Sequence, residues 1–154
     1  MVNFKISLFE LLKCLSSAQD LVSPEVVNHH QQVAYLSYRI ACEMELSLPE
    51  QKDIFLAGLV HDIGALSVDE RLDIIESEPK YINNHAFVGA RLFGDFKPMQ
   101  ESAEIIRFHH IPWKDGKGRI FKGNPVPLGS HVIHLADRIC TKLDPEMNVL
   151  SQIS

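Results

Sequence analysis

Eight histidines stand out in this chain of 154 residues, because they are as numerous as the glycines and the phenylalanines. Neutral histidine is the commonest protein ligand of transition metals, and aspartate often completes such sites. The histidines do not form a terminal run of the kind that an affinity tag leaves. The sequence therefore raises the question of whether they converge on a metal. They are His29, His30, His61, His85, His109, His110, His131 and His134.

Two adjacent pairs are the first candidates for a site. His61-Asp62 follows an apolar run, and burying an ionised aspartate is costly unless a cation or several donors compensate. A surface aspartate beside a packed histidine is the alternative. His109-His110 precedes Pro112, and at a helix end the second residue can leave helical geometry so that both rings face one centre. A surface pair near a helix C-terminus is the alternative there.

Three further positions are ambiguous when taken singly. His29 lies four residues before Val33 on the apolar stripe of its helix, whereas His30 points about 100° away. A lone histidine on such a stripe is more often a hydrogen-bonded core residue than a ligand. His85 precedes small residues that permit close helix packing. Asp137 lies in an apolar helical stretch, where an ion pair with a neighbouring arginine would also explain it.

The order of these residues is more informative than any one of them. A histidine, a His-Asp pair, a third histidine, a His-His pair and an aspartate follow one another along the chain. Roughly one helix hairpin separates successive members. Five helices could therefore each project a ligand inward, as helix bundles do around di-metal sites.

Helical periodicity dominates the remaining sequence, and we predict an all-α fold. There is no convincing alternating strand and no internal repeat. Ser23 suits the N-cap of the second helix, Pro24 suits its first turn, and Gly64 is expected to end the third helix. Residues 113–127 are rich in glycine and proline and predict a loop. The expected helices span residues 5–19, 24–46, 49–63, 67–77, 83–94, 98–110 and 127–143.

Composition excludes several classes of protein. The chain is 45% apolar and 23% charged, with a formal net charge of −5 that argues against a nucleic-acid polymer as partner. It contains no apolar run of about 18 residues, so we expect no membrane span. The N-terminus does not resemble a signal peptide, and three cysteines without C-x-x-C spacing indicate reduced thiols. A cytoplasmic protein is expected.

The domain organisation is expected to be simple. A helix within residues 1–22 packs on, or precedes, a single domain over residues 23–154. Its apolar face could cover the bundle or meet a second copy in a homodimer. Because nothing after the last helix looks like a natural C-terminal cap, we expect a fragment of a longer signalling protein with a neighbouring domain.

The sequence resembles the HD superfamily of metal-dependent phosphohydrolases, and within it the HD-GYP group. The resemblance covers about residues 8–143 and implies an HD-domain bundle of about six to eight helices around two, sometimes three, iron or manganese ions. It is carried by His29-x-x-x-Val33-Ala34, Leu59-Val60-His61-Asp62-Ile63-Gly64, His85-x-x-x-Gly89, His109-His110 and Leu135-Ala136-Asp137.

By position, the resemblance implies two metal sites that share the bridging carboxylate of Asp62. His30 is the substitute if His29 is not a ligand. Mixed imidazole and carboxylate ligands also suit zinc, nickel or cobalt. The first site comprises His29, His61, Asp62 and Asp137, and the second comprises Asp62, His85, His109 and His110.

The activity that the resemblance implies is phosphodiester hydrolysis. The HD-GYP group hydrolyses cyclic di-GMP, a bacterial second messenger, so the expected ligand is a nucleotide or cyclic dinucleotide. Two close metal ions can generate a bridging hydroxide and hold the phosphate during in-line attack. His134, three residues before Asp137, could orient that ligand, although ordinary packing would explain both His134 and His131.

Several departures from the HD-GYP pattern fall at positions where the substrate would be recognised. Ala65 replaces the usual lysine after H-D-I-G. The D-G-x-G core survives at residues 115–118, but Arg119 and Ile120 replace the tyrosine and proline. The segment after Asp137 also differs. A solvated loop is the alternative to a phosphate-binding role for its basic residues. The basic candidates for phosphate contacts are Lys114, Lys117, Arg119 and Arg138.

The metal-ligand set is intact although these other positions differ, and two interpretations of the protein's function remain. One is an active phosphohydrolase with a different or relaxed substrate. The other is a catalytically weak or inactive metal-binding module in signalling. A metal-free regulatory domain would need basic partners for Asp62 and Asp137, and no basic residue adjoins Asp62 in the sequence.

Overall fold

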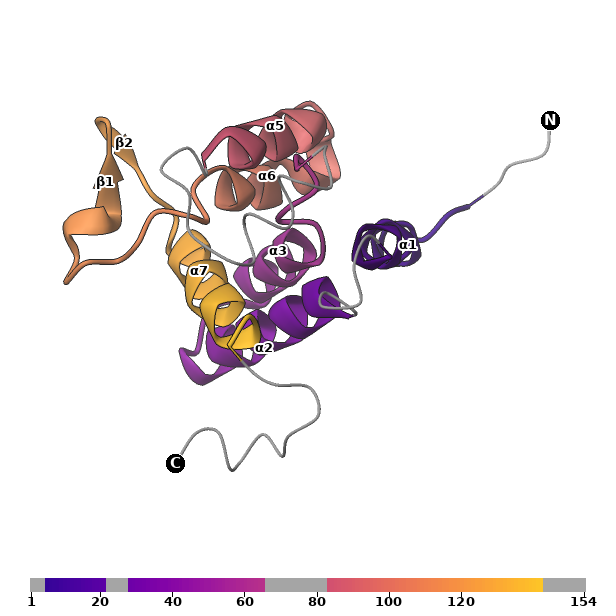
Figure 1. The fold of residues 1–154 in the computed structure, drawn as a ribbon, viewed down its shortest axis with the longest axis horizontal. Coiled ribbons are helices and arrows are strands. Elements are labelled where there is room, and N and C mark those ends of the chain that lie inside the picture. The colour runs from indigo at the N-terminus through magenta and orange to yellow at the C-terminus, as the bar shows by residue number, and fades with distance from the viewer. Residues whose placement is uncertain (1–4, 22–27, 66–82, 143–154) are drawn as a thin grey trace.

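The computed structural model describes residues 5–21, 28–65 and 83–142. Six α-helices make up most of these ranges (Figure 1), which confirms the all-α prediction. The expected helix over residues 67–77 lies outside the described residues. The helices are α1 (Leu8–Asp20), α2 (His29–Glu43), α3 (Leu48–Leu59), α5 (Asn83–Gly94), α6 (Gln100–Arg107) and α7 (Leu128–Cys140).

Short elements flank α6. The 3₁₀ turn η2 (Lys97–Met99) precedes it, and η3 (Lys117–Arg119) lies in the loop that follows. The strands β1 (Ile120–Phe121) and β2 (Asn124–Pro125) pair antiparallel and stand out from the helices in Figure 1. This hairpin was not predicted, because a strand of two residues is too short to show alternation.

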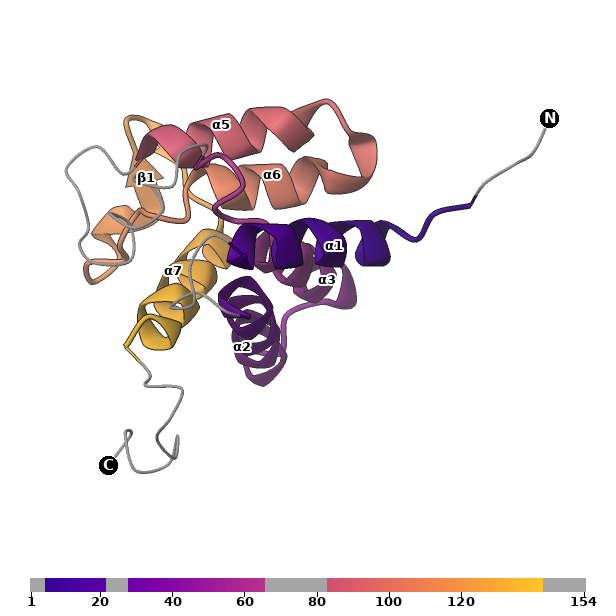
Figure 2. The same cartoon turned by 45° about the vertical axis from the view of Figure 1, so that its right-hand side comes forward.

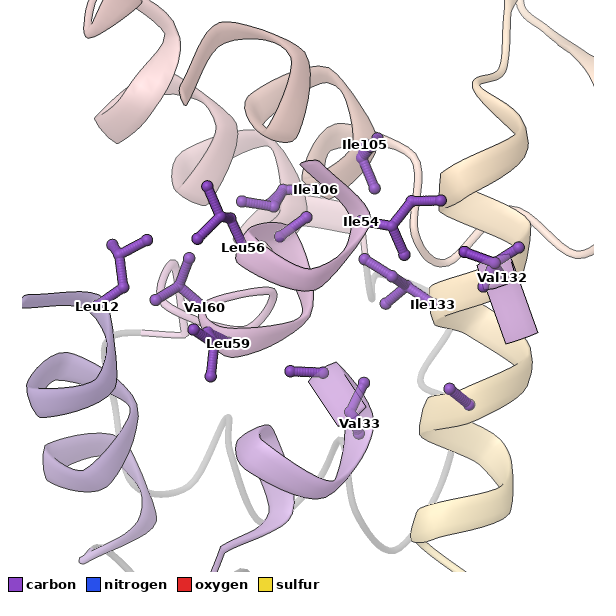
Figure 3. Packing of buried hydrophobic residues seen from close by; sticks show 14 of the residues in the cluster. Leu12, Val33, Ile54, Leu56, Leu59, Val60, Ile105, Ile106, Val132 and Ile133 are labelled. Atoms are coloured by element: carbon purple, nitrogen blue, oxygen red, sulfur yellow. The ribbon is translucent and has the colours of Figure 1, made fainter. Parts of the chain in front are cut away.

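The centre of the bundle is α3, which packs against α1, α2, α6 and α7. Figure 2 shows α5 and α6 as an adjacent pair on one side of it. The side chains at these contacts are apolar and fully buried, and burying each of them stabilises the fold by roughly 1.5–3 kcal/mol. Representatives from five helices, shown in Figure 3, are Leu12, Val33, Leu59, Ile106 and Ile133.

The helices α2 and α3 approach each other closely at Gly58. A Cβ at this position would lie 2.7 Å from the Cα of Ala34, so a residue with a side chain would push the helices apart. The contact holds the first turn of α2 beside the turn that follows α3. That turn carries His61 and Asp62.

The start of α2 differs from the prediction. Asn28 has a left-handed φ of 61°, so the helix begins at His29 and does not continue from residue 24. The expected N-cap Ser23 and the first-turn Pro24 lie outside the described residues. As a result, His29 and His30 occupy the first turn of α2.

The ends of α3 and α6 also come earlier than predicted. The helix α3 ends at Leu59, and residues 61–64 form a turn instead of its last coil. The helix α6 ends at Arg107, so residues 108–110 turn away from the helix axis before Pro112. Both turns carry histidines, and they free these side chains from helical spacing.

A buried hydroxyl joins α7 to α6. The Ser130 Oγ donates a hydrogen bond of 2.8 Å to the carbonyl oxygen of Ile105. Ser130→Ala is therefore expected to lower the free energy of unfolding by about 1 kcal/mol, the usual contribution of such a bond. Urea denaturation monitored by circular dichroism measures this change.

The matched control for this prediction is Ser37 in α2. It is also fully buried, but its hydroxyl has no hydrogen-bond partner among the described residues. Ser37→Ala should leave the free energy of unfolding unchanged or raise it slightly, because an unpaired buried hydroxyl is unfavourable. Equal losses in the two variants would contradict the role given to Ser130.

Candidate metal centre

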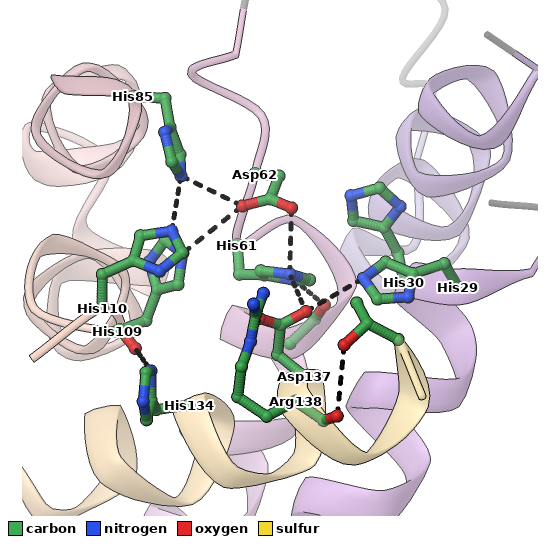
Figure 4. A network of polar contacts seen from close by, with 12 residues as sticks. His29, His30, His61, Asp62, His85, His109, His110, His134, Asp137 and Arg138 are labelled. Atoms are coloured by element: carbon green, nitrogen blue, oxygen red, sulfur yellow. Dashed lines mark hydrogen bonds and ion pairs between the residues drawn. The ribbon is translucent and has the colours of Figure 1, made fainter. Parts of the chain in front are cut away.

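The seven side chains expected at the metal sites meet in the interior of the bundle (Figure 4), and we call them the histidine–aspartate cluster. They come from α2, the turn after α3, α5, the turn after α6, and α7. Counted over the whole residue, none of the seven is more than 8% exposed. The members are His29, His61, Asp62, His85, His109, His110 and Asp137.

One half of the cluster surrounds Asp62 Oδ1. This oxygen lies 3.2 Å from His85 Nε2 and 3.3 Å from His109 Nε2. His110 completes the group, with its Nε2 2.8 Å from that of His85. One ligand atom from each of the four residues lies within 4.8 Å of all the others, a spacing that could hold a metal ion.

The other half brings together His29, His61 and Asp137, whose ligand atoms also lie within 4.8 Å of one another. Asp137 Oδ1 is 3.2 Å from His29 Nε2 and 3.8 Å from His61 Nε2. The second oxygen of Asp62, Oδ2, is 3.2 Å from His61 Nε2. Asp62 therefore presents one oxygen to each half, which is the geometry that a bridging carboxylate needs.

Backbone carbonyls fix the tautomers of two rings. His61 Nδ1 lies 3.0 Å from the carbonyl oxygen of Gly58, and His109 Nδ1 lies 2.7 Å from that of Ile106. Because a carbonyl oxygen can only accept, each Nδ1 carries the hydrogen. In the neutral rings, each Nε2 lone pair then faces an oxygen of Asp62, which is also an acceptor. Such a pair of acceptors needs a cation between them, either a proton or a metal ion.

The carboxylates of the cluster remain ionised in spite of burial. Burial would raise the pKa of Asp62 and of Asp137, but the surrounding histidines hold both well below the usual range. Burial would lower the pKa of His61, but Asp62 and Asp137 outweigh it and hold that pKa well above its usual value. Burial lowers the pKa of His109 and His110, which favours the neutral, metal-binding ring. The interior is thus arranged to receive positive charge.

Arg138 is engaged with the cluster instead of facing an open phosphate site. Its Nη2 and Nε lie 2.6 and 3.1 Å from Asp137 Oδ2. The guanidinium therefore holds one oxygen of Asp137 while the other faces His29 and His61. Both explanations considered for Asp137, an arginine partner and a histidine site, apply at once.

The two other histidines of α7 contact backbone. His134 was considered both as a residue that could orient Asp137 and as a packing residue, and its Nδ1 lies 3.1 Å from the carbonyl oxygen of His109. His131 Nδ1 lies 2.9 Å from the carbonyl oxygen of Ile111. These contacts support the turn that presents the paired histidines of the cluster.

The basic residues of the loop do not join the cluster directly. Lys114, Lys117 and Arg119 are exposed, and Arg119 lies over the ring of Trp113, 5.0 Å from its centroid. Among the described residues, no hydrogen bond or ion pair connects the three to the cluster. The position where the family pattern has lysine carries no charge, because it is occupied by Ala65, which is fully buried.

Sequence reasoning missed Asp20, the last residue of α1. Its Oδ1 lies 2.5 Å from Nδ1 of His30, and both side chains are buried. His30, considered only as a substitute for His29, lies beside His61 and not on a solvent face. An acid at the end of one helix and a histidine in the next carry no sequence signal that they will meet.

Comparison with known proteins agrees with this geometry. The sequence pattern of the HD domain family matches residues 26–142, and the chain therefore belongs to this family. The resemblance to the HD superfamily is confirmed. No solved structure gives a significant match. None of the described helices is long and apolar enough to cross a lipid bilayer.

Two curated relatives are cyclic dinucleotide phosphodiesterases by name. The chain is 28% identical over 139 residues to 3'3'-cGAMP-specific phosphodiesterase 1 of Vibrio cholerae, which covers 90% of this chain and 32% of the relative. It is 30% identical over 139 residues to the cyclic di-GMP phosphodiesterase of Thermotoga maritima, which covers 84% of this chain and 38% of the relative. The chain thus spans about a third of the length of these proteins.

Proposed function

We propose that this chain is a metal-dependent phosphohydrolase domain of the HD-GYP type that hydrolyses a phosphodiester bond of a cyclic dinucleotide. The observation that carries the proposal is that Nε2 of His61 and Nε2 of His109 each face an oxygen of the buried Asp62, an arrangement that needs a cation between the facing atoms. Relatives with the same domain are phosphodiesterases by name. A bacterial, cytoplasmic setting with neighbouring signalling domains is part of the proposal.

The donor set fits two divalent transition-metal ions. Five imidazoles and two carboxylates suit iron or manganese, and also zinc, nickel or cobalt, better than they suit magnesium. A bound pair of such ions would activate water and neutralise charge on a phosphate. We assign His29, His61, Asp62 and Asp137 to one ion, and Asp62, His85, His109 and His110 to the other.

The residues around the ions have distinct tasks in this proposal. Asp62 keeps the two halves of the cluster at a fixed separation, because each of its oxygens faces one half. Arg138 fixes the orientation of Asp137. Lys114 and Lys117 are exposed on the loop and are the candidates to contact substrate phosphates.

A metal-binding signalling module with little turnover is the second candidate. Three observations favour it, and each concerns a basic group that an HD-GYP substrate would be expected to meet. Ala65 is uncharged, Arg119 lies over Trp113, and Arg138 is bound to Asp137. In this alternative the ions stabilise the bundle, and the helices respond to a ligand or to a neighbouring domain.

Metal analysis followed by activity assays tests the proposal. We expect about two ions per chain after anaerobic purification, and a linear dinucleotide product from cyclic di-GMP or 3'3'-cGAMP with iron or manganese. His109→Ala should reduce the ion content to about one per chain. The control is Asp53→Asn, because Asp53 contacts the Ser102 hydroxyl outside the cluster and should be dispensable for metal binding.

The outcomes separate the two candidates. Two ions without hydrolysis of either dinucleotide or of bis(p-nitrophenyl) phosphate would favour the signalling module. An ion content below two that His109→Ala leaves unchanged would refute the di-metal site altogether.

A further inference from the structure

A second carboxylate–histidine pair borders the histidine–aspartate cluster and lies outside the motifs that define the family resemblance. Asp20 ends α1, and His30 lies in the first turn of α2. Asp20 Oδ1 is 2.5 Å from His30 Nδ1, and the two residues are only 6% and 5% exposed. The pair is therefore not a solvated surface contact.

The contact determines which nitrogen of His30 is free. An ionised carboxylate can only accept, so His30 Nδ1 carries the hydrogen and donates it to Asp20. The lone pair of the neutral ring is then on Nε2. This atom is buried and has no hydrogen-bond partner among the described residues. Leaving such an atom unpaired is unfavourable, so we expect a bound group at Nε2.

The His30 ring is close to the proposed metal ligands. The centroid of the His30 ring lies 5.0 Å from that of His61 and 5.4 Å from that of His29. One ligand atom of His30 lies within 4.8 Å of ligand atoms of both His61 and Asp62. Figure 4 shows His30 and His29 side by side next to His61. The three residues His30, His61 and Asp62 thus form a further group that could hold a metal.

We propose that His30 is an additional ligand of the ion held by His61 and Asp62, and that Asp20 is the residue that positions it. The inference rests on the proposed metal centre but adds a donor alongside His29, not in its place. A carboxylate that accepts a hydrogen bond from the other ring nitrogen of a ligating histidine fixes the orientation of the ring. It also makes the ligating nitrogen a better electron-pair donor to the metal. The ion is a divalent transition metal of the class that accepts several imidazoles, such as cobalt, zinc, iron or manganese.

The inference gives α1 a role in the site. This helix precedes residues 26–142, the part that matches the HD domain, and it packs against α2 and α3. Through Asp20, the docking of α1 would set the affinity of one of the two ions. A chain with α1 displaced would keep the HD motif intact and still bind that ion less tightly.

Titration of the metal-free full chain with Co²⁺ tests this directly. Affinities come from competition with a chelator, and the visible absorption of bound Co²⁺ reports on its ligands. His30→Ala should weaken one ion by at least about 10–100-fold, leave the other unchanged and alter the absorption spectrum. Asp20→Ala should act in the same direction. Asp20→Asn, which can still accept the hydrogen bond, should recover part of the lost affinity.

Ser16→Ala is the matched control on α1. Ser16 is fully buried, and its hydroxyl has no hydrogen-bond partner among the described residues, so both Co²⁺ affinities should stay as in the wild type. If Asp20→Ala and His30→Ala lower the melting temperature of the metal-free protein but leave both affinities and the spectrum unchanged, the pair is structural and the inference is overturned. If His30→Ala does not fold, the nearly isosteric Asp20→Asn replaces it. Its expected result is a loss of Co²⁺ affinity smaller than that of Asp20→Ala, and an affinity equal to the wild type would count against the inference. A wild-type chain that binds no Co²⁺ would overturn the proposed function as well.

Discussion

Asp62→Asn is expected to abolish hydrolysis and to reduce the metal content to below about one ion per chain. Asp62 is the residue that faces both halves of the histidine–aspartate cluster, with Oδ1 toward His85 and His109 and Oδ2 toward His61. The amide keeps the shape of the side chain but removes the negative charge and one of the two acceptor oxygens. The remaining oxygen is neutral and can face only one half, so both ions are expected to lose affinity.

The size of the effect follows from what the ions contribute. Metal ions supply several kcal/mol of transition-state stabilisation, and each 1.36 kcal/mol corresponds to a tenfold change in rate. We therefore expect turnover to fall by at least about 10³-fold. Metal ions should also stop raising the melting temperature of the protein, because a ligand stabilises a fold only when its concentration is not far below its dissociation constant.

Asp53→Asn is the matched control for this prediction. Asp53 lies in α3, is partly buried, and has its nearest polar contact, at 3.5 Å, with the hydroxyl of Ser102, outside the cluster. This variant should keep both ions and its activity. Two ions retained in Asp62→Asn, measured by elemental analysis, would contradict the bridging role.

The members of the cluster could be predicted because they come singly or in pairs from five successive segments of the chain, in the order that carries the family resemblance. The expectation that His109 and His110 face one centre was met for a local reason. The helix α6 ends before them, and the turn removes the divergence of about 100° that helical spacing would impose.

The partners of the buried charges could not be predicted in the same way. Asp20 meets His30 only because α1 packs against α2, and Arg138 turns back onto its neighbour Asp137 instead of toward solvent. Each contact depends on side-chain conformation and on helix packing, neither of which leaves a periodic signal. For the same reason, His30 was placed about 100° from the apolar stripe, with no sequence signal that Asp20 and His61 lie on that side of α2.

Gly64→Ala is expected to destabilise the fold by about 3 kcal/mol and to separate two members of the cluster. A Cβ at this position would lie 2.0 Å from the carbonyl oxygen of His85 and 2.5 Å from the backbone nitrogen of Gly89. Both atoms belong to the backbone of α5, so no side-chain rotation can relieve the overlap. Overpacked sites typically cost 1–3 kcal/mol, and a backbone clash belongs at the upper end of that range.

The same displacement should reach the metal centre. Gly64 lies two residues after Asp62, and its contact with α5 sets the 3.2 Å distance between Asp62 Oδ1 and His85 Nε2. Moving these groups apart by about 1 Å can lower the rate of hydrolysis by about 10²-fold. Excess metal should restore part of the lost stability, because ions that bind both groups favour the folded arrangement.

Gly94→Ala provides the control, because no heavy atom lies within 4 Å of a Cβ added there and alanine is favoured over glycine in a helix by up to about 1 kcal/mol. Urea denaturation should show this variant to be at least as stable as the wild type. If metal-free Gly64→Ala were equally stable, the close contact with α5 would be contradicted. If Gly64→Ala lost stability but kept both ions and full activity, the approach of the turn to α5 would not be what sets the distance between Asp62 and His85. Some other contact would then have to hold these two residues together.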